Sequence, residues 1–132
     1  MSISKNKKIY TLSKEERIKS KKQIQLLFKE GRRIKSDNLH LLFLRHDHKG
    51  PVPIKMSFAV PKKKTALASN RNRLKRRMRE IFRHHKSELQ TAEASCFLMI
   101  LIFTADEERS YKQIAQSFAN LIEKFRKKME KF

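Results

Sequence analysis

The 132-residue sequence is short of the residue types on which several kinds of site depend. Its single cysteine, Cys96, excludes an intramolecular disulfide and a cysteine zinc site. With only Gly31 and Gly50, the chain lacks a glycine-rich phosphate loop. No His/Cys/Asp cluster has metal-ligand spacing, and nothing indicates a Ser-His-Asp arrangement. We therefore predict no catalytic residue and no metal ligand in this chain.

Long hydrophobic segments are also missing. The longest apolar run, Cys96 to Phe103, is far too short to cross a bilayer. The first ten residues, MSISKNKKIY, lack the apolar stretch of a signal peptide. Cys96 sits inside the apolar run, as a reduced and buried small hydrophobe does. These features predict a cytoplasmic protein.

Acidic residues are scarce, since 13 Asp and Glu face 33 Lys and Arg, for a net charge of +20. The excess is concentrated in residues 1–35 and 61–90, each with a net charge of +9. Two dense basic blocks indicate a nucleic acid or an anionic membrane as partner. Membrane binding would need a basic helix with apolar residues free to enter lipid. Here the core needs those residues, so we expect nucleic acid and no membrane.

The length and patterning predict one domain preceded by a tail. Residues 1–12 are basic and poor in apolar residues, which predicts a mobile tail. Residues 13–132 form the expected single RNA-binding domain. A leading helical segment is expected from Ser13 through Ile18. A firmer helix follows, with Ser20 as N-cap and Gly31 as its stop.

The middle and end of the chain alternate between strand and helix patterns. Strands are expected at residues 32–36, 39–44, 54–60 and 95–103. The basic helix is expected from its N-cap Asn70 to about Gln90. Thr104 and Glu107 have capping-box spacing and should open the last helix. The order α-β-β-β-α-β-α predicts an α+β two-layer sandwich, a small four-stranded sheet with helices mainly on one face.

The basic helix carries its charge at the unfavourable end. With Asn70 as N-cap, residues 71–73 occupy the first three helical positions. The helix dipole puts partial positive charge there, so Arg71 and Arg73 each cost about 0.3–1 kcal/mol when exposed. A sequence selected for stability alone would place acids at these positions. This end of the helix is therefore expected to face a polyanion.

The run RNRLKRRMREIFR, residues 71–83, resembles the signature of the protein subunit of bacterial ribonuclease P. That pattern is RNR, one residue, KR, two residues, RE. The strand ending in Val60-Pro61-Lys62-Lys63 and the Ser110-Tyr111 pair before the last helix are similar to the family as well. Ile24 stands where the family usually has phenylalanine, and Leu42 and Phe43 stand where tyrosines are common on the second strand. The resemblance covers roughly residues 12–125.

This resemblance implies a ribonucleoprotein role. In the family, the RNA subunit is the catalyst and uses Mg²⁺, held mainly by RNA, to remove the 5′ leader of precursor tRNA. The protein binds this RNA through its basic helix and contacts the leader in a cleft between the first helix and the sheet. A monomer in a 1:1 complex with RNA is implied, and so is a left-handed β-α-β crossover around the basic helix.

Two sets of site residues follow from the resemblance. The RNA-binding set comprises Lys62, Lys63, Lys64, Arg71, Asn72, Arg73, Lys75, Arg76 and Arg79. The leader-binding set comprises Arg17, Lys21, Phe28, Phe43 and Phe58. The three phenylalanines also have the spacing of core residues, so packing is the competing interpretation. Glu80 is interpreted as an acid that orients neighbouring arginines.

Two other functions remain open on the sequence. A general RNA-binding protein, such as a ribosomal or architectural component, would carry the same charge. A basic-zipper DNA binder is disfavoured, because no heptad run follows the basic helix. A free-standing nuclease has little support, because no catalytic constellation is found.

Overall fold

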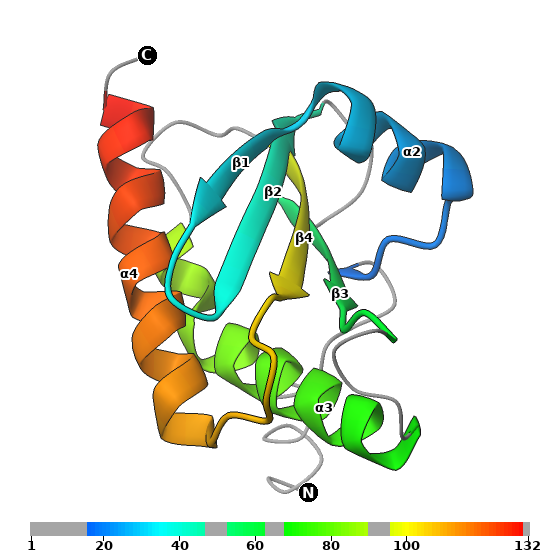
Figure 1. Cartoon of the computed structure of the whole chain (residues 1–132). Coiled ribbons are helices and arrows are strands. Elements are labelled where there is room, and N and C mark those ends of the chain that lie inside the picture. Colours follow the sequence, from blue (N-terminus) through cyan, green and yellow to red (C-terminus); the bar gives the residue numbers. More distant parts are fainter. Residues whose placement is uncertain (1–15, 47–52, 63–67, 90–95, 131–132) are drawn as a thin grey trace, which may run out of the picture.

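The computed structural model describes residues 16–46, 53–62, 68–89 and 96–130, and the predicted tail at residues 1–12 lies outside them. The predicted order of helices and strands is confirmed (Figure 1). A short 3-10 helix, η2, follows the basic helix α3. The elements are α2 (Lys21–Glu30), β1 (Arg32–Lys35), β2 (Leu39–Arg45), β3 (Ile54–Ala59), α3 (Ala68–His85), η2 (Lys86–Leu89), β4 (Phe97–Phe103) and α4 (Tyr111–Glu130).

The four strands form one mixed sheet in the order β1-β2-β4-β3. The β1–β2 and β2–β4 pairs are antiparallel, whereas β3 and β4 are parallel. All seven residues of β4 are buried. A continuous apolar run is expected of a strand that has neighbours on both sides and cover on both faces. The longest apolar run of the sequence therefore becomes a central strand.

Helices cover the two faces of the sheet unequally. Phe97, Met99 and Leu101 of β4 belong to the larger apolar core, which also contains the apolar residues of α3 and α4. Leu98 and Ile100 point the other way and pack with Leu27 of α2. The prediction of helices mainly on one face is confirmed. We call the face under α2 the open face, because one short helix covers it.

The connection from β3 to β4 has the rare hand. The two strands are parallel neighbours, and the chain passes between them through α3 and η2. In Figure 1 both strands run downwards, β4 lies to the left of β3, and α3 lies behind the sheet. A right-handed connection behind the sheet would place the second strand on the right. The crossover is therefore left-handed, as the resemblance implies, although about 98% of such crossovers are right-handed.

Two of the three helix starts predicted from capping residues differ in the structure. Helix α3 begins at Ala68, so Asn70 lies within its first turn and is not the N-cap. Helix α4 begins at Tyr111, and Thr104 does not open it. Instead, the Gln113 backbone N–H donates to Ser110 Oγ (3.2 Å), and the Ser110 backbone N–H donates to Gln113 Oε1 (3.0 Å). Capping spacing occurs twice in this segment, and the second occurrence is the one used.

The chain ahead of α2 is strand-like where a helix was expected. Arg17 forms a parallel β-bridge with Met56, and the Ile18 backbone N–H donates to the Met56 carbonyl oxygen (3.4 Å). The expected helical segment is therefore wrong at Arg17 and Ile18. Ser20 caps α2 as predicted, because its side chain accepts from the Gln23 backbone N–H.

Gly31 ends α2 as predicted, but it does so through a close approach. Its backbone is extended, with φ −68°, so no left-handed conformation is involved. A Cβ at this position would lie 2.4 Å from the Leu27 carbonyl oxygen and 3.3 Å from Leu42 Cγ. The absence of a side chain thus lets the chain turn from α2 directly into β1.

Candidate nucleic-acid interface

Helix α3 packs its apolar stripe into the core and turns its basic residues outward. The residues of this stripe are fully buried and recur at spacings of three and four; they are Leu74, Met78, Ile81 and Phe82. The positions between them carry Lys and Arg, apart from Glu80. The helical period of the sequence thus forces the cations onto the surface, where they fall into two groups with different partners.

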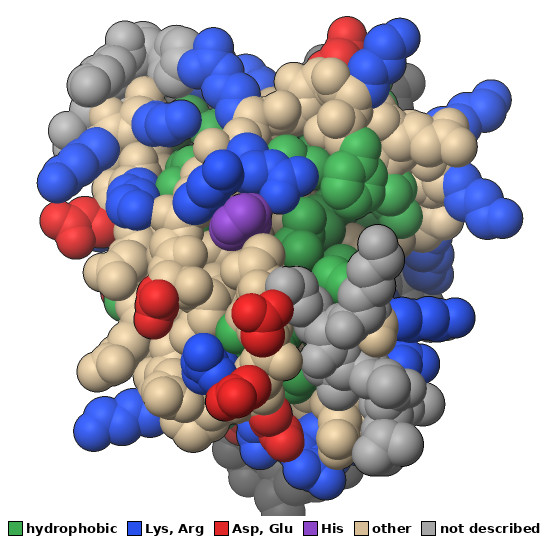
Figure 2. Space-filling view, in the orientation of Figure 1, with side chains coloured by type: hydrophobic (Ala, Val, Ile, Leu, Met, Phe, Trp, Pro, Cys, Tyr) green, Lys and Arg blue, Asp and Glu red, His purple; other side chains and the backbone are tan. Residues whose placement is uncertain are grey.

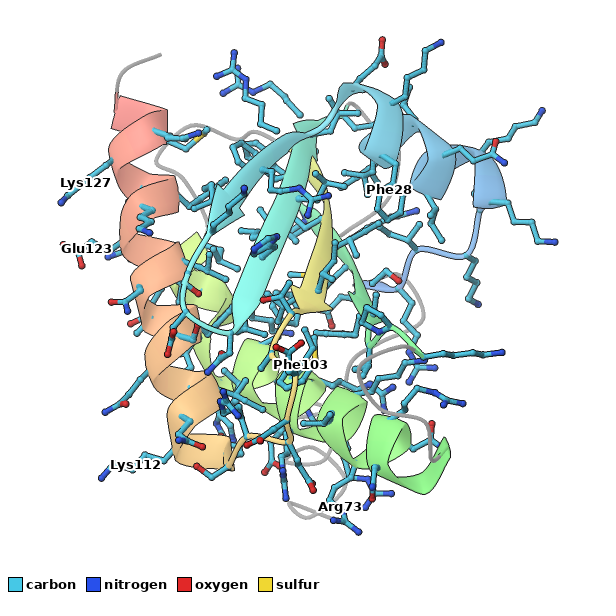
Figure 3. All side chains as sticks on the ribbon, in the orientation of Figure 1. Phe28, Arg73, Phe103, Lys112, Glu123 and Lys127 are labelled. Atoms are coloured by element: carbon cyan, nitrogen blue, oxygen red, sulfur yellow. The ribbon has the colours of Figure 1, made fainter. Side chains whose placement is uncertain are left out.

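The first group consists of Arg73 and Arg77, which we call the paired arginines. Glu108, in the segment before α4, accepts from Nη1 of Arg77 (3.1 Å) and from Nη1 of Arg73 (3.3 Å). Arg77 Nη1 also donates to the Arg109 carbonyl oxygen (2.7 Å). Figure 3 shows Arg73 towards the outer end of α3, directed away from the sheet. One carboxylate therefore orients and partly neutralises two guanidinium groups.

The second group lines a hollow between α3, β3 and the chain ahead of α2, which we call the basic cleft. Its cavity volume is about 200 Å³. The cleft is lined by Arg17, Ile18, Met56, Ser57, Phe58, Lys75 and Arg79. No acid lines it, and none of its three cations forms an ion pair within the described residues. The half-buried Phe58 is its aromatic component.

Arg79 lies where cations repel one another. Partial burial lowers the pKa of Arg79, and the nearby charges of Arg17, Arg83 and Arg76 lower it further. Neighbouring Arg83 has a buried Nε with no hydrogen-bond partner in the described structure. Such an arrangement costs free energy in the protein alone, and an anion bound in the cleft would recover it.

Arg83 is a residue that sequence reasoning left out of the RNA-binding set. Arg83 follows Arg79 by four residues and Glu80 by three, so the three side chains lie on the same side of α3. Lys75 and Arg83 are each four residues from Arg79, and residues four apart are neighbours on a helix. This spacing could have identified Arg83 from the sequence. The signature motif ends before Arg83, which is why the resemblance did not include it.

An ion pair holds the Arg17 side of the basic cleft in place. Lys86 Nζ of η2 donates to Glu16 Oε2 at 2.8 Å, and Glu16 is 7% exposed. The bridge between Arg17 and Met56 fixes the next residue against β3. No local sequence pattern predicts this contact, because the two partners are 70 residues apart.

The open face carries part of the predicted leader-binding set. Phe28 of α2 is 55% exposed, although large apolar side chains are usually buried. Figure 3 shows it beneath α2, in front of the sheet. Lys21 is exposed at the first position of the same helix. In Figure 2 hydrophobic side chains gather on this face beside a histidine and several Lys and Arg side chains.

The structure does not assemble the leader-binding set into one cleft. Phe43 is 3% exposed, and its ring packs edge-on against Phe125 (5.1 Å between centroids) and Phe97 (6.4 Å). It faces α4, so the prediction that Phe43 lines the leader cleft is wrong and the packing interpretation holds. Phe58 also faces α3, with Phe82 at 6.0 Å. Strand alternation explains both results, since odd and even positions face opposite ways.

The rest of the RNA-binding set is distributed around α3. Lys62 is exposed in the turn after β3, whereas Lys63 and Lys64 lie outside the described residues. Asn72 and Arg76 are exposed, and Arg71 is half-buried. Glu80 forms no ion pair with an arginine among the described residues. The prediction for Glu80 is therefore wrong, and Glu108 holds the arginines instead.

Two further searches cover the described part of the chain. No group of three His, Cys, Asp or Glu side chains there lies close enough together to hold a metal ion. No helix among those residues has the length and apolar content needed to cross a membrane.

Comparison with known proteins finds the same family over most of the chain. A family model described as Ribonuclease P matches residues 12–126. A ribonuclease P protein component from Chlorobium phaeobacteroides is 37% identical over 86 residues, 63% of this chain and 59% of that protein. One from Pseudoalteromonas atlantica is 27% identical over 121 residues, 92% of this chain and 95% of that protein.

Solved structures agree on the fold. The RNase P protein of Staphylococcus aureus superposes with a TM-score of 0.70 at 23% identity, over 83% of this chain and 94% of that one. The RNase P protein of Thermotoga maritima gives 0.68 at 24% identity, over 83% and 96%.

Proposed function

The chain belongs to the ribonuclease P protein family, and from this premise we propose how it acts as a subunit of that endoribonuclease. It binds the RNA subunit through α3 and the basic cleft, and it holds the 5′ leader of precursor tRNA on the open face of the sheet. The observation that carries the proposal is the basic cleft, whose three cations have no acidic partner among the described residues.

The basic cleft suits an RNA backbone. Arg17, Lys75 and Arg79 converge from two segments on one hollow, so that a phosphate entering it meets more than one cation. Phosphate contacts by Lys and Arg supply most of the non-specific affinity for nucleic acids. Ser57 adds a hydroxyl and Phe58 an aromatic edge to the same wall. Asn72, exposed on α3, makes a directed hydrogen bond to the RNA.

The leader is assigned to the open face because an exposed aromatic side chain lies there. Unpaired bases are commonly held by stacking on aromatic rings. Phe28 is accessible for this purpose at 55% exposure, and Lys21 supplies a charge at the start of the same helix. Phe43 and Phe58 have no place in this part of the proposal.

Catalysis is assigned to the RNA subunit, which holds the Mg²⁺ that the reaction needs. The described residues do not fit a protein metal site, because no three potential ligands lie together. No step of the reaction is therefore assigned to a side chain of this protein. Its contribution is to neutralise phosphates and orient the leader, as a monomer in a 1:1 cytoplasmic complex with the RNA.

A reconstitution assay tests the proposal. We expect the protein, added to a bacterial ribonuclease P RNA, to lower the Mg²⁺ concentration needed to cleave precursor tRNA. The variant Lys75→Gln/Arg79→Gln should lose most of this effect, because two cleft cations are gone. The matched control is Lys112→Gln/Lys127→Gln, whose side chains point outward from α4 in Figure 3. An unchanged Mg²⁺ requirement with folded wild-type protein would refute the proposal.

The same assay separates this function from general RNA binding. A general binder should lose affinity for all RNAs similarly when Arg79 is replaced by glutamine. A ribonuclease P subunit should lose preference for its own RNA and for precursors that carry a leader. Cleavage by the protein without RNA would instead identify a free-standing nuclease.

A further inference from the structure

Strand β1 turns two cations towards the open face. Its burial pattern is exposed, exposed, buried, exposed, because Ile34 enters the core behind the sheet. Arg33 and Lys35, on either side of Ile34, therefore point to the other face. The register places Arg33 opposite Leu42 and Lys35 opposite His40. Leu42 packs with Leu27 of α2, so this edge of the sheet is continuous with the surface beneath that helix.

A histidine orients the first of these cations. Arg33 Nη1 lies 2.9 Å from His40 Nδ1. A guanidinium can only donate, so His40 Nδ1 accepts and the imidazole proton resides on Nε2. Burial lowers the pKa of His40, and the charges of Arg33 and Lys35 lower it further, which keeps the imidazole neutral near pH 7. The neighbour thus holds the guanidinium in place without neutralising it.

No acid compensates this group within the described residues. Lys124 of α4 reaches the same edge, where its Nζ donates to the Lys35 carbonyl oxygen (2.6 Å). The nearest acids along the chain are Glu30 and Asp37, which form no ion pair among the described residues, and Glu123, which pairs with Lys127 at 3.5 Å. We call Arg33, Lys35, His40 and Lys124 the β1 cation edge. Its charges are as free of acidic partners as those of the basic cleft.

We propose that the β1 cation edge binds phosphates of the leader beyond the nucleotides that contact Phe28, with Arg33 as its main contact. This inference rests on the proposed function, since it extends the path of the leader across the open face. Three features favour single-stranded RNA as the occupant: the fixed donors of Arg33, the exposed ring of Phe28 on the same face, and positive charge with no ion-paired acid among the described residues. Figure 2 shows Lys and Arg side chains, a histidine and hydrophobic side chains next to one another on this face, with acidic side chains below them.

Leader length provides the test. Holoenzyme reconstituted with Arg33→Gln is compared with wild type for precursors with leaders of about two and about ten nucleotides, lengths that bracket the contact span of a small binding surface. The matched control is Arg32→Gln, on the same strand with its side chain on the other face. We expect Arg33→Gln to weaken binding of the long-leader precursor about threefold to tenfold. The slope of log affinity against log salt should fall by about 0.7, the value for one single-strand phosphate contact.

The short-leader precursor should bind all three proteins equally, and Lys35→Gln should reproduce the Arg33→Gln pattern more weakly. Equal losses for both precursors, or equal losses for Arg33→Gln and Arg32→Gln, would overturn the inference. The variant Phe28→Ala distinguishes it from the proposed function. If Phe28→Ala reduces the preference for long leaders while Arg33→Gln does not, only the further inference fails. If wild type shows no dependence on the leader, the assignment of the open face fails first.

Discussion

The paired arginines and the cations of the basic cleft, two groups that both include residues of α3, differ in their acidic partners. The paired arginines share Glu108, whereas the cations of the basic cleft have no acidic partner among the described residues. An exposed ion pair contributes little to stability, about 0.2–1 kcal/mol, but it fixes the geometry of long side chains. In the cleft, the pKa of Arg79 is lowered by partial burial and, next, by the charges of Arg17, Arg83 and Arg76. The basic residues of α3 are therefore of two kinds, one held in position by a carboxylate and the other crowded by like charges that a bound anion would offset.

The largest effect should come from the cleft. We expect Lys75→Gln/Arg79→Gln to weaken binding to ribonuclease P RNA by about 100-fold, since each substitution removes a charge-assisted contact worth on the order of 1.5 kcal/mol. The corresponding Arg73→Gln/Arg77→Gln should cost about threefold to tenfold, because Glu108 already offsets part of those charges. Filter binding at several salt concentrations measures both. Equal losses in the two variants would remove the distinction between the groups.

The cleft variant should also be more stable than wild type. Removing Arg79 relieves repulsion from Arg17, Arg83 and Arg76, so the free energy of unfolding should rise by about 0.2–0.5 kcal/mol, the size of a solvent-screened like-charge pair on a helix. Urea denaturation measures it, with Arg73→Gln as the control that should gain nothing. A loss of stability at Arg79→Gln would show that the residue supports the fold more than the RNA.

The second effect is indirect and concerns Glu16. Its ion pair with Lys86 fixes the Arg17 side of the cleft. Glu16→Gln should lower the free energy of unfolding by about 1–2 kcal/mol and weaken RNA binding up to tenfold. The double variant Glu16→Lys/Lys86→Glu restores an ion pair and should recover RNA affinity with the net charge unchanged. Failure of that rescue, with a folded protein, would argue against a positioning role.

A smaller effect of opposite sign is expected at Glu108. Glu108→Gln releases Arg73 and Arg77 from their shared carboxylate, so RNA affinity should rise about twofold to fivefold, the equivalent of an exposed ion pair. The gain should shrink as salt is raised, because screening weakens exposed pairs. Glu107→Gln removes the same charge next to it and should give a smaller gain. Weaker binding by Glu108→Gln would mean that orienting the two arginines matters more than freeing them.

The smallest effect should appear on varying pH. Lys and Arg side chains stay charged between pH 5 and 8. The difference in RNA affinity between the basic-cleft variant and the paired-arginine variant should therefore persist over that range. His40 titrates there, with its pKa lowered in the fold by burial and by Arg33 and Lys35. The unfolded chain therefore takes up a proton first, and stability is lost as pH falls below about 6.5. Comparing urea midpoints of wild type and His40→Gln at several pH values isolates this contribution; equal midpoint shifts in both proteins would assign it elsewhere.

The parts of the fold that follow from local pattern were predictable. Alternation placed β3, the apolar run placed β4, and the helical period of Leu74, Met78 and Phe82 placed the buried side of α3. Helix starts were less predictable, because polar residues at capping distance recur. Asn70 and Thr104 each have the residue type of an N-cap. Which residue caps the helix depends on where the segment between the preceding strand and the helix ends. The hand of the crossover came from the resemblance alone, since the base rate opposes it.

For the site, sequence identified charges but not their partners. The contact of Glu108 with Arg73 spans 35 residues, and that of Glu16 with Lys86 spans 70. Neither spacing has a local signature. Phe43 was misassigned because an aromatic residue on a strand is equally compatible with either face until the register is known. Arg33 and His40 come together only through that register.

The strand order determines when each part of the sheet can form while the protein is being synthesised. Strand β4 lies between β2 and β3, so β3 has no strand beside it until residues 97–103 have left the ribosome. By then the whole of α3, with its positive charge, has been made and lacks the strand that anchors its apolar stripe. Strand pairs between distant segments form slowly. Until they form, the folding intermediates expose hydrophobic surface and are prone to aggregate. A nascent chain of this protein therefore passes through a stage in which its most cationic helix is complete and its core is not, and that stage cannot end before residues 97–103 emerge.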